Sequence, residues 1–450
     1  MRPSKPNGHC AVEAPPGSAH ASQQGTPAER NSQQLDSSRR SHARSDSAIS
    51  GEPTSAGFQE LQRIDADVPA AVERRLEILL TERAAQATAL DPVFAHDLAD
   101  RVARFTLGGG KRTRAQFLWW ALRACGGGVG DSEAALRMGC ALELIQTCAL
   151  VHDDVMDGSR LRRGQPALHA DVEAQYADAV SSPHRERFGE SAAILAGDLA
   201  LAWADDVLVD TELCPTRARR VRGLWSAMRT EMVAGQYLDL QGQTTSSRSL
   251  AHAIRAACLK SALYSVERPL ALGAALSDAD DATTAALCSA GRCVGIAFQL
   301  RDDLQDVFGT AEQSGKPSGS DVRSGKPTYL IAVAQARAEA RDDHSALDVL
   351  RNSLGRPELS EDGLARVREV LVSTGAQATT EAKISRLTAQ GMRHLEAAAL
   401  EPDGRRHLRQ LLQSTAGIPT AQNAPAGGPT ASCPRTGSLL LTVGAEGASR

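Results

Sequence analysis

The chain has 450 residues, of which 42% are hydrophobic and only 3% aromatic, so aliphatic side chains must build most of its core. Its formal net charge of −4 gives no reason to expect a nucleic-acid partner. The nine cysteines include no Cys-x-x-Cys pair and no zinc-type histidine spacing, which argues against a zinc site and fits a reducing cytoplasm.

The first 57 residues are rich in Ser, Gln, Pro, Ala and Gly. This composition predicts a disordered tail, because it offers little apolar surface to bury. A targeting peptide is the alternative interpretation, but the stretch also carries acidic residues, and targeting peptides are poor in acids. We therefore expect a tail without a targeting function and no signal peptide.

From residue 58 to residue 415 the apolar positions follow a helical period, and no β-branched alternating run interrupts them. Residues 416–450 are again rich in Pro, Gly, Ala, Ser and Thr, and we expect a second disordered tail. No uninterrupted apolar run approaches the ~20 residues that span a bilayer, so we expect no stable membrane insertion. The sequence predicts an all-α fold, a large helical bundle in one domain. The expected helices cover residues 68–87, 115–124, 134–151, 191–208, 217–240, 250–276, 282–300 and 328–341, with weaker ones between 345 and 413.

An acidic motif follows the apolar run 134–151, for which Asp131 is the expected N-cap. The motif contains Asp153, Asp154 and Asp157. Residues four apart lie on the same face of a helix, so Asp153 and Asp157 should point the same way, with Asp154 beside them.

A second copy of the motif, Asp302, Asp303 and Asp306, closes the apolar run that ends at Leu300. Packed carboxylates repel one another and are costly to desolvate, so such a cluster in a cavity implies bound cations. Carboxylate oxygens suit Mg²⁺. The alternative is two solvated helix ends, which we expect for the Asp-Asp pairs at 205–206, 280–281 and 342–343, since these lack a third Asp at i+4.

Basic residues lie near both acidic motifs in the sequence. A glycine-rich turn at 108–110 precedes Lys111 and Arg114, which are spaced to converge on one phosphate at a helix start; the alternative is a plain turn with solvated charges. Acids for Mg²⁺ beside bases for phosphate predict a pocket for diphosphates. The other basic candidates are Arg162 and Arg163 after the first motif, Lys260 beside Ser261 within a helix, and Lys316 and Lys326 in loops after the second motif.

These motifs resemble those of the trans-polyprenyl diphosphate synthase family, which elongates isoprenoids head to tail. The resemblance runs in order over residues 105–330 and leaves both tails uncovered. The matching positions are Gly109-Gly110-Lys111-Arg112-x-Arg114, the first acidic motif with Arg162-Arg163-Gly164, Gly197-Asp198, Gly235-Gln236-Tyr237-Leu238-Asp239, Lys260-Ser261, Phe298-Gln299-x-x-Asp302-Asp303 and Lys316.

The resemblance implies helices around a deep central cavity, usually in a homodimer. It implies that Asp153, Asp157 and Asp302 bind a cluster of Mg²⁺ ions that grips the allylic diphosphate. Asp154 and Asp306 would support these ligands, and Asp239 could reach the same cluster.

The resemblance also divides the basic residues between two substrates. Arg162, Lys260 and Lys326 would hold the allylic diphosphate, and Lys111, Arg114 and Arg163 would hold isopentenyl diphosphate. Ser261 and Gln299 would line the position of the allylic cation. Two positions depart from the family pattern: Gln146 stands where the family often has His, and Ala115 where it commonly has Pro.

The expected product is geranylgeranyl diphosphate, because Ala149 and Cys148 are small and should let the growing chain pass to a floor at Ile145 or Leu142. A farnesyl or longer product is the alternative. A terpene cyclase would not need a second diphosphate site, and a non-catalytic synthase subunit should have lost an acidic motif. Both are therefore weaker interpretations.

Overall fold

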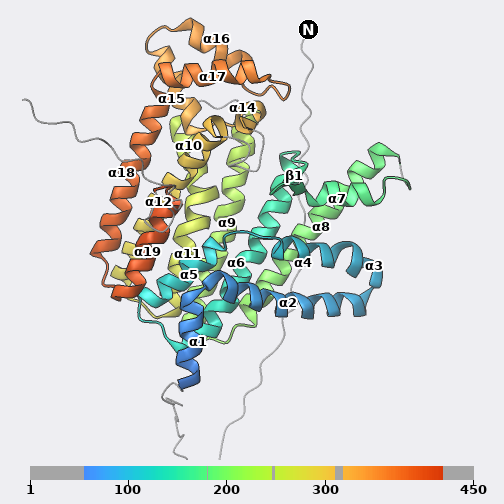
Figure 1. The fold of residues 1–450 in the computed structure, drawn as a ribbon, viewed down its shortest axis with the longest axis vertical. Helices are drawn as coiled ribbons and strands as arrows, with labels where there is room; N and C mark the ends of the chain where they lie inside the picture. Colours follow the sequence, from blue (N-terminus) through green and yellow to red (C-terminus); the bar gives the residue numbers. More distant parts are fainter. Residues whose placement is uncertain (1–54, 180, 246–248, 310–317, 419–450) are drawn as a thin grey trace, which may run out of the picture. The chain divides into compact units, whose positions relative to one another are not determined.

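Helices make up almost all of the structure, which confirms the all-α prediction (Figure 1). The structure is a computed structural model that describes residues 55–179, 181–245, 249–309 and 318–418. All of these belong to one compact unit. The tails expected at 1–57 and 416–450 fall almost entirely outside the described residues.

The elements follow one another along the described chain in this order. They are α1 (Ser55–Ala66), α2 (Val68–Leu90), α3 (Pro92–Phe94), η1 (Ala95–Ala99), α4 (Asp100–Leu107), α5 (Thr113–Ala124), α6 (Val129–Met156), β1 (Leu161–Arg162), β2 (Gln165–Pro166), α7 (Leu168–Gln175), α8 (Ser182–Val209), α9 (Pro215–Thr245), α10 (Leu250–Ala257), η2 (Cys258–Glu267), α11 (Arg268–Leu276), α12 (Asp281–Phe308), α14 (Ser320–Ser324), α15 (Tyr329–Glu339), α16 (His344–Ser353), α17 (Glu361–Ser373), α18 (Ala376–Ala397) and α19 (Pro402–Thr415).

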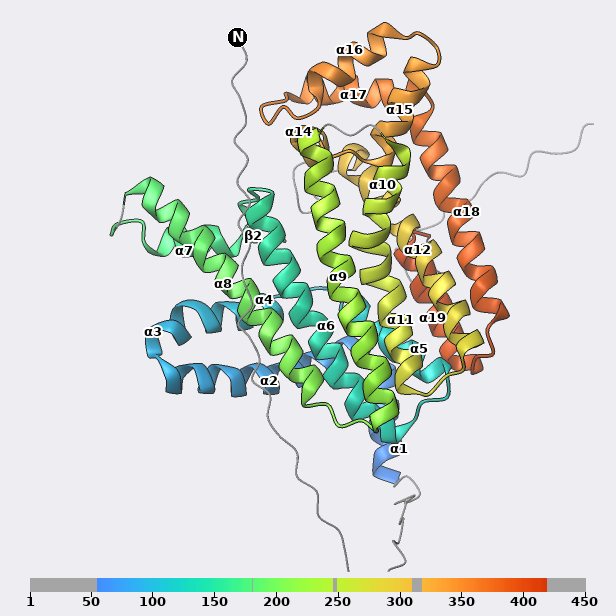
Figure 2. The ribbon, with the colours of Figure 1, turned by 180° about the vertical axis from the view of Figure 1, so that it is seen from behind.

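Helix α6 lies in the core, where it packs against α2, α5 and α8 (Figures 1 and 2). By length and composition α6 is apolar enough to cross a membrane, with a mean hydropathy of 1.4 over its most apolar window. However, 67% of that window is buried inside the protein. The apolar run is therefore explained by burial in the core of the bundle.

The start of α6 corrects one detail of the sequence analysis. The helix begins at Val129, and its N-cap is Gly128. Asp131 therefore lies inside the first turn, where its carboxylate accepts a hydrogen bond from the backbone N–H of Gly128 at 3.0 Å. An acid in the first turn stabilises the helix N-terminus as a cap does. Asp131 was therefore correctly associated with the start of the helix, but it lies three residues after the N-cap.

The expected helix over 250–276 is divided by the π-helix η2, between α10 and α11. Neighbouring helices press closely on this segment. A Cβ atom on Gly235 of α9 would lie 2.3 Å from the backbone nitrogen of Lys260, and one on Gly295 of α12 would lie 2.5 Å from the Cα of Ala262. Short π-helical segments often occur at functional sites, and η2 carries Lys260 and Ser261.

A two-stranded hairpin, β1–β2, follows the first acidic motif and was not expected from the sequence. Arg163 and Gly164 form its two-residue turn, with φ angles of 54° and 75°. Positive φ at both central positions gives the turn that matches the twist of a tight hairpin. The hairpin therefore fixes the positions of Arg162 and Arg163 beside α6.

Candidate active site

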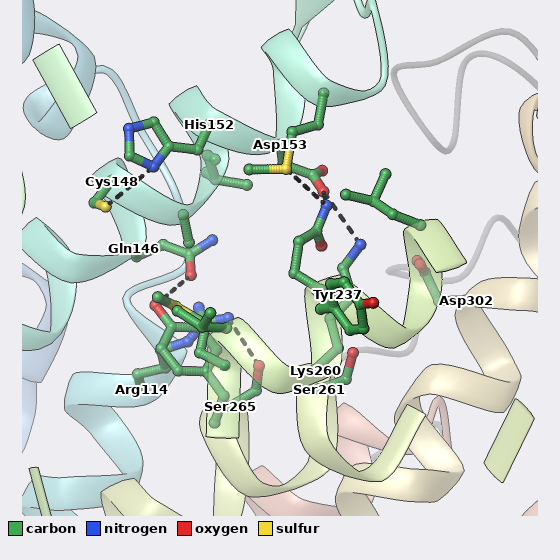
Figure 3. A pocket seen from close by; sticks show the side chains of 18 of the residues that line it. Arg114, Gln146, Cys148, His152, Asp153, Tyr237, Lys260, Ser261, Ser265 and Asp302 are labelled. Atoms are coloured by element: carbon green, nitrogen blue, oxygen red, sulfur yellow. Dashed lines mark hydrogen bonds and ion pairs between the residues drawn. The ribbon is translucent and has the colours of Figure 1, made fainter. Parts of the chain in front are cut away.

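Two adjoining cavities meet at the acidic motifs, where Asp153, Lys260, Ser261, Phe298 and Asp302 line both of them. We call the first, of about 470 Å³, the apolar cavity, and the second, of about 520 Å³, the polar cavity. Figure 3 shows the apolar cavity with Asp153 on α6 facing Lys260 on η2 and with Asp302 approaching from α12. Its apolar lining includes Cys148, Ala149, Leu150, Met156, Met232, Val233, Leu240 and Phe298. The polar cavity is lined by Lys111, Arg162, Asp239, Gln299, Asp303, Asp306, Asp321 and Lys326 besides the shared residues.

Asp153 lies at the centre of a group of cationic and amide donors. Its carboxylate accepts hydrogen bonds from Lys260 Nζ at 3.1 Å and from Gln236 Nε2 at 3.2 Å. Burial acts to raise the pKa of Asp153, but the neighbouring ammonium groups of Lys260 and Lys326 outweigh it and hold this pKa below its usual range. Asp153 is therefore an anion in the folded protein.

Asp154, the next residue, is fully buried. Its two oxygens accept from Arg162 Nε at 3.0 and 3.1 Å. Burial acts to lower the pKa of Arg162, yet the hydrogen bond and charge of Asp154 raise it overall. Asp154 thus anchors the hairpin, through Arg162, to the end of α6.

Two lysines join carboxylates from different helices. Lys260 lies between Asp153 and Asp239, 2.7 Å from the latter, and Lys326 lies 3.0 Å from Asp157. Within the described ranges, no three His, Cys, Asp or Glu side chains form a group that could hold a metal ion. In this state Lys260 and Lys326 neutralise Asp153 and Asp157 of the first acidic motif.

The second acidic motif divides its side chains between the cavities and the protein. Asp302 lines both cavities. Asp303 is buried and accepts from Gln299 Nε2 at 2.8 Å, and burial, assisted by the charge of Asp321, raises its pKa well above the usual value. Asp306 accepts a hydrogen bond from Ser320 Oγ at 2.5 Å.

Ser261 and Gln299 are brought together as a pair. The Ser261 hydroxyl donates to Gln299 Oε1, so η2 and α12 are joined beside the wall shared by the two cavities. Ser261 lines both cavities and Gln299 lines the polar one, so the hydroxyl and amide dipoles lie near the boundary between charged and apolar surroundings.

The glycine-rich turn places its two basic candidates in different cavities. Lys111 lines the polar cavity, whereas Arg114 lines the apolar cavity. Arg114 donates to Ser265 Oγ at 2.8 Å and stacks over the Tyr264 ring at 4.5 Å. Arg112, between them, is buried and pairs with Glu143 at 3.0 Å, so it supports the turn.

Gln146 and Arg163 complete the candidates that the structure describes. Gln146 lines the apolar cavity and accepts a hydrogen bond from Tyr264 at 2.9 Å. Arg163 donates to the carbonyl oxygen of Gly109 at 2.5 Å, and burial together with the charge of Arg112 lowers its pKa. Lys316 lies outside the described residues.

Two residues at the site were assigned no role from the sequence. The first is Gln236 of α9, which donates to Asp153. Its position in the Gly235-Gln236 motif could have indicated a role. The other is Asp321, which lines the polar cavity 3.6 Å from the ammonium of Lys326. Burial raises the pKa of Asp321 to about 7, although the charge of Lys326 opposes this shift.

Comparisons with known proteins identify the family of this chain. Residues 96–370 match the family described as "Polyprenyl synthetase". The chain is 37% identical to a farnesyl diphosphate synthase of Geobacillus stearothermophilus over 51% of this chain and 73% of that protein. It is 34% identical to a geranylgeranyl diphosphate synthase of Methanosarcina mazei over 50% of this chain and 64% of that one.

One solved structure is similar to this chain in both fold and sequence. The geranylgeranyl pyrophosphate synthase of Corynebacterium glutamicum, in complex with isoprenyl diphosphate and magnesium, superposes with a TM-score of 0.73 and 36% identity. The match covers 77% of this chain and 98% of that one. The chain therefore belongs to the polyprenyl synthetase family, and it is a prenyltransferase of isoprenoid biosynthesis.

Proposed function

We propose that this prenyltransferase condenses isopentenyl diphosphate with allylic diphosphates to give a longer trans-polyprenyl diphosphate. The observation that carries the proposal is the junction of a charged cavity with an apolar one at Asp153, Lys260 and Asp302. An allylic diphosphate has the same division, with an anionic head and a hydrocarbon tail. The reacting carbon joins the two parts and would lie at that junction.

We propose Mg²⁺ as the metal. The donor set fits, since Asp153, Asp157 and Asp302 are hard oxygen ligands, and Asp153 is held in its anionic form. Bound Mg²⁺ would offset the charge that develops on the departing diphosphate. In the Corynebacterium relative, magnesium accompanies the isoprenyl diphosphate. Lys260 and Lys326 would then exchange their contacts with Asp153 and Asp157 for contacts with phosphate oxygens.

The remaining basic residues would hold the two diphosphates apart. Arg162 is fixed by Asp154 next to the polar cavity, which suits it to the allylic diphosphate together with the two lysines. Lys111 and Arg114 follow the glycine-rich turn and Arg163 donates to its Gly109 carbonyl, which suits the three to isopentenyl diphosphate, although Lys111 and Arg114 line different cavities in this structure.

The protein's part in the chemistry is positioning and shielding. The C–O bond of the allylic diphosphate breaks, and the double bond of isopentenyl diphosphate attacks the cation that forms. A proton then leaves the new product for the released diphosphate. The dipoles of Ser261 and Gln299 lie where they can face the cation, and the apolar cavity excludes water from it.

We propose geranylgeranyl diphosphate as the main product. Cys148 and Ala149 line the apolar cavity, and neither is large enough to close it. Ile145 and Leu142, the expected floor, are fully buried on the preceding turns of α6 and are not among the residues that line this cavity. The relatives include farnesyl and geranylgeranyl synthases, so similarity alone does not select a chain length.

Product analysis of the purified protein with labelled isopentenyl diphosphate tests the proposal. Each substrate is supplied alone and then both together, with Mg²⁺. Release of diphosphate only when both are present, with a product of twenty carbons, supports the proposal. Release from the allylic substrate alone would indicate a cyclase, and no release would indicate a non-catalytic subunit.

We further propose a homodimer in the cytoplasm. Support for the dimer comes from large apolar side chains that are exposed on α8, with Ile194 47% and Leu195 58% exposed. Support for a reducing compartment comes from the cysteines, which are free thiols throughout the described part of the chain. Sedimentation of the wild type and of Leu195→Glu would test the dimer.

A further inference from the structure

The short helix α14 lies between the second acidic motif and Lys326. Glycines in the left-handed region bound it on both sides, Gly319 with φ 77° and Gly325 with φ 74°. A side chain on Gly319 would also be strained for lack of space, since its Cβ would lie 2.6 Å from Leu364. The path of the chain through α14 is therefore closely determined.

Asp306 holds the start of α14 with its whole carboxylate. One oxygen accepts from Ser320 Oγ at 2.5 Å, and the other accepts from the backbone N–H of Asp321 at 3.0 Å. The backbone carbonyl of Asp306 also accepts from the N–H of Gly319 at 2.6 Å. Asp306, the last aspartate of the second motif, thus fixes the start of α14 through these hydrogen bonds.

Asp321 in turn holds Lys326 at two points. Its backbone carbonyl accepts from the N–H of Lys326 at 2.9 Å, and its carboxylate lies 3.6 Å from the Lys326 ammonium. That ammonium lies 3.0 Å from Asp157 on α6. The side chains of Lys326, Asp157 and Asp321 are all less than 20% exposed, so solvent screens these ion pairs only weakly.

We propose that Asp321 is a positioning residue that keeps the ammonium of Lys326 aimed at the diphosphate. This inference rests on the proposed function, in which Asp157 turns to the metal and leaves Asp321 as the described carboxylate within 4 Å of the Lys326 ammonium, with Asp239 and Asp153 acting from further away. Asp321 lies on the same short helix that leads into Lys326 and stays in place. A lysine has a long, flexible stem, and a fixed partner reduces the conformational freedom that it loses on binding an anion.

The opposite effect is also physically possible, which makes the proposal testable. A carboxylate near a diphosphate repels it, so removing the charge of Asp321 could strengthen binding. The proposal requires that the ordering of Lys326 outweighs this repulsion.

A double-mutant cycle decides between these effects. Four proteins are compared at pH 8.5, where the Asp321 carboxyl is ionised, namely wild type, Asp321→Asn, Lys326→Met and the double variant, and calorimetry gives the Kd of inorganic diphosphate at one fixed Mg²⁺ concentration. We expect Asp321→Asn to raise this Kd about 5- to 10-fold in the wild type but less than about 2-fold in the Lys326→Met background. Additive effects, or tighter binding by Asp321→Asn, would overturn the proposal.

Glu361→Gln is the matched control for simple loosening of the loop. Glu361 accepts a hydrogen bond from Arg323 of α14 at 2.7 Å and has no contact with Lys326 among the described interactions. We expect its Kd to equal that of the wild type; a rise as large as that of Asp321→Asn would contradict a specific role.

Two further measurements keep the test decisive. If thermal melting shows that Asp321→Asn folds poorly, Asp321→Glu replaces it, because this variant keeps the negative charge but displaces it. We expect a smaller rise in Kd for Asp321→Glu. An unchanged Kd in this variant would count against positioning. A wild type that binds inorganic diphosphate yet transfers no prenyl group would refute the proposed function while the cycle on Asp321 still gives its own answer.

Discussion

The ammonium group of Lys260 lies 3.1 Å from a carboxylate oxygen of Asp153. This contact joins the π-helix η2 to the end of α6 across the two cavities. When a metal cation binds Asp153, it can take over the neutralisation of this carboxylate from Lys260. The ammonium group of Lys260 is then free to bind an anionic substrate. The same exchange is open to Lys326 and Asp157.

Removal of either central aspartate should abolish turnover. We expect Asp153→Ala and Asp302→Ala to lower kcat by about 10²-fold or more, because each removes a proposed metal ligand, while the fold survives. Steady-state assays at saturating Mg²⁺ with a circular dichroism spectrum of each variant measure both effects. Asp281→Ala, at a fully exposed site, is the control. Near-normal activity in either central variant would contradict the metal assignment.

The two groups of basic residues should separate the two substrates. We expect Lys111→Ala and Arg114→Ala to raise the KM for isopentenyl diphosphate by about 10-fold or more, and Lys260→Ala to do so for the allylic diphosphate. Initial rates with one substrate varied at a time measure this. The exposed Arg219 provides a control substitution to Ala. Equal losses for both substrates in all three variants would refute the division.

The sequence predicted the helices and the acidic faces because both depend on local spacing. The apolar period gave both ends of α2 within three residues and the start of α12 within one, whereas α12 runs eight residues past its expected end at Leu300 because it includes the acidic motif. The i+4 spacing placed Asp153 and Asp157 near each other. Local spacing does not reveal which distant side chain meets a given residue. The sequence therefore named Lys260 but could not show that it binds Asp153 and Asp239.

Two features of the backbone were also beyond the sequence. The hairpin at Arg163 depends on a non-glycine residue with positive φ, which carries little composition signal. The π-helix η2 depends on how closely α9 and α12 approach it, and the glycines that permit this approach lie far away in the sequence.

The close approach of α9 to η2 leads to a further prediction. Gly235→Ala should destabilise the protein by about 1–3 kcal/mol and lower activity, because its Cβ would lie 2.3 Å from the Lys260 backbone nitrogen. Gly223→Ala on the same helix is the matched control. No atom lies within 4 Å of its added Cβ, so we expect about 0.5–1 kcal/mol of stabilisation. Chemical denaturation and kcat measure both; equal behaviour of the two variants would contradict the packing argument.

Cysteine reactivity should report on the apolar cavity. Burial raises the pKa of Cys148 to about 12, so its thiol stays protonated at pH 8 and should react slowly with iodoacetamide. Cys214 is exposed and serves as the internal comparison. Its labelling should be faster by about 10-fold or more at pH 8, and the rate at Cys148 should rise as pH increases toward its pKa. Peptide mapping by mass spectrometry measures this, and comparable rates at pH 8 would show that Cys148 is not buried in solution.

The length of the product should depend on the α6 face behind the first acidic motif. Ala149 lines the apolar cavity, whereas Ile145, one turn or about 5.4 Å further from Asp153, is fully buried. One turn is roughly the length of one isoprene unit, so a bulky side chain at Ala149 should shorten the product by one unit.

We therefore expect Ala149→Phe and Cys148→Phe to shift the main product from twenty to fifteen carbons. Chromatography of the dephosphorylated alcohols measures the distribution. Ala202→Phe makes the same change at an exposed position of α8 and should leave the products unchanged. Cys148 also contacts His152, 3.7 Å away, so a loss of all activity in Cys148→Phe would reflect that contact and leaves Ala149→Phe to decide. An unchanged distribution in an active Ala149→Phe enzyme would show that side chains on other helices, such as Met232 and Leu240 of α9, limit the chain instead.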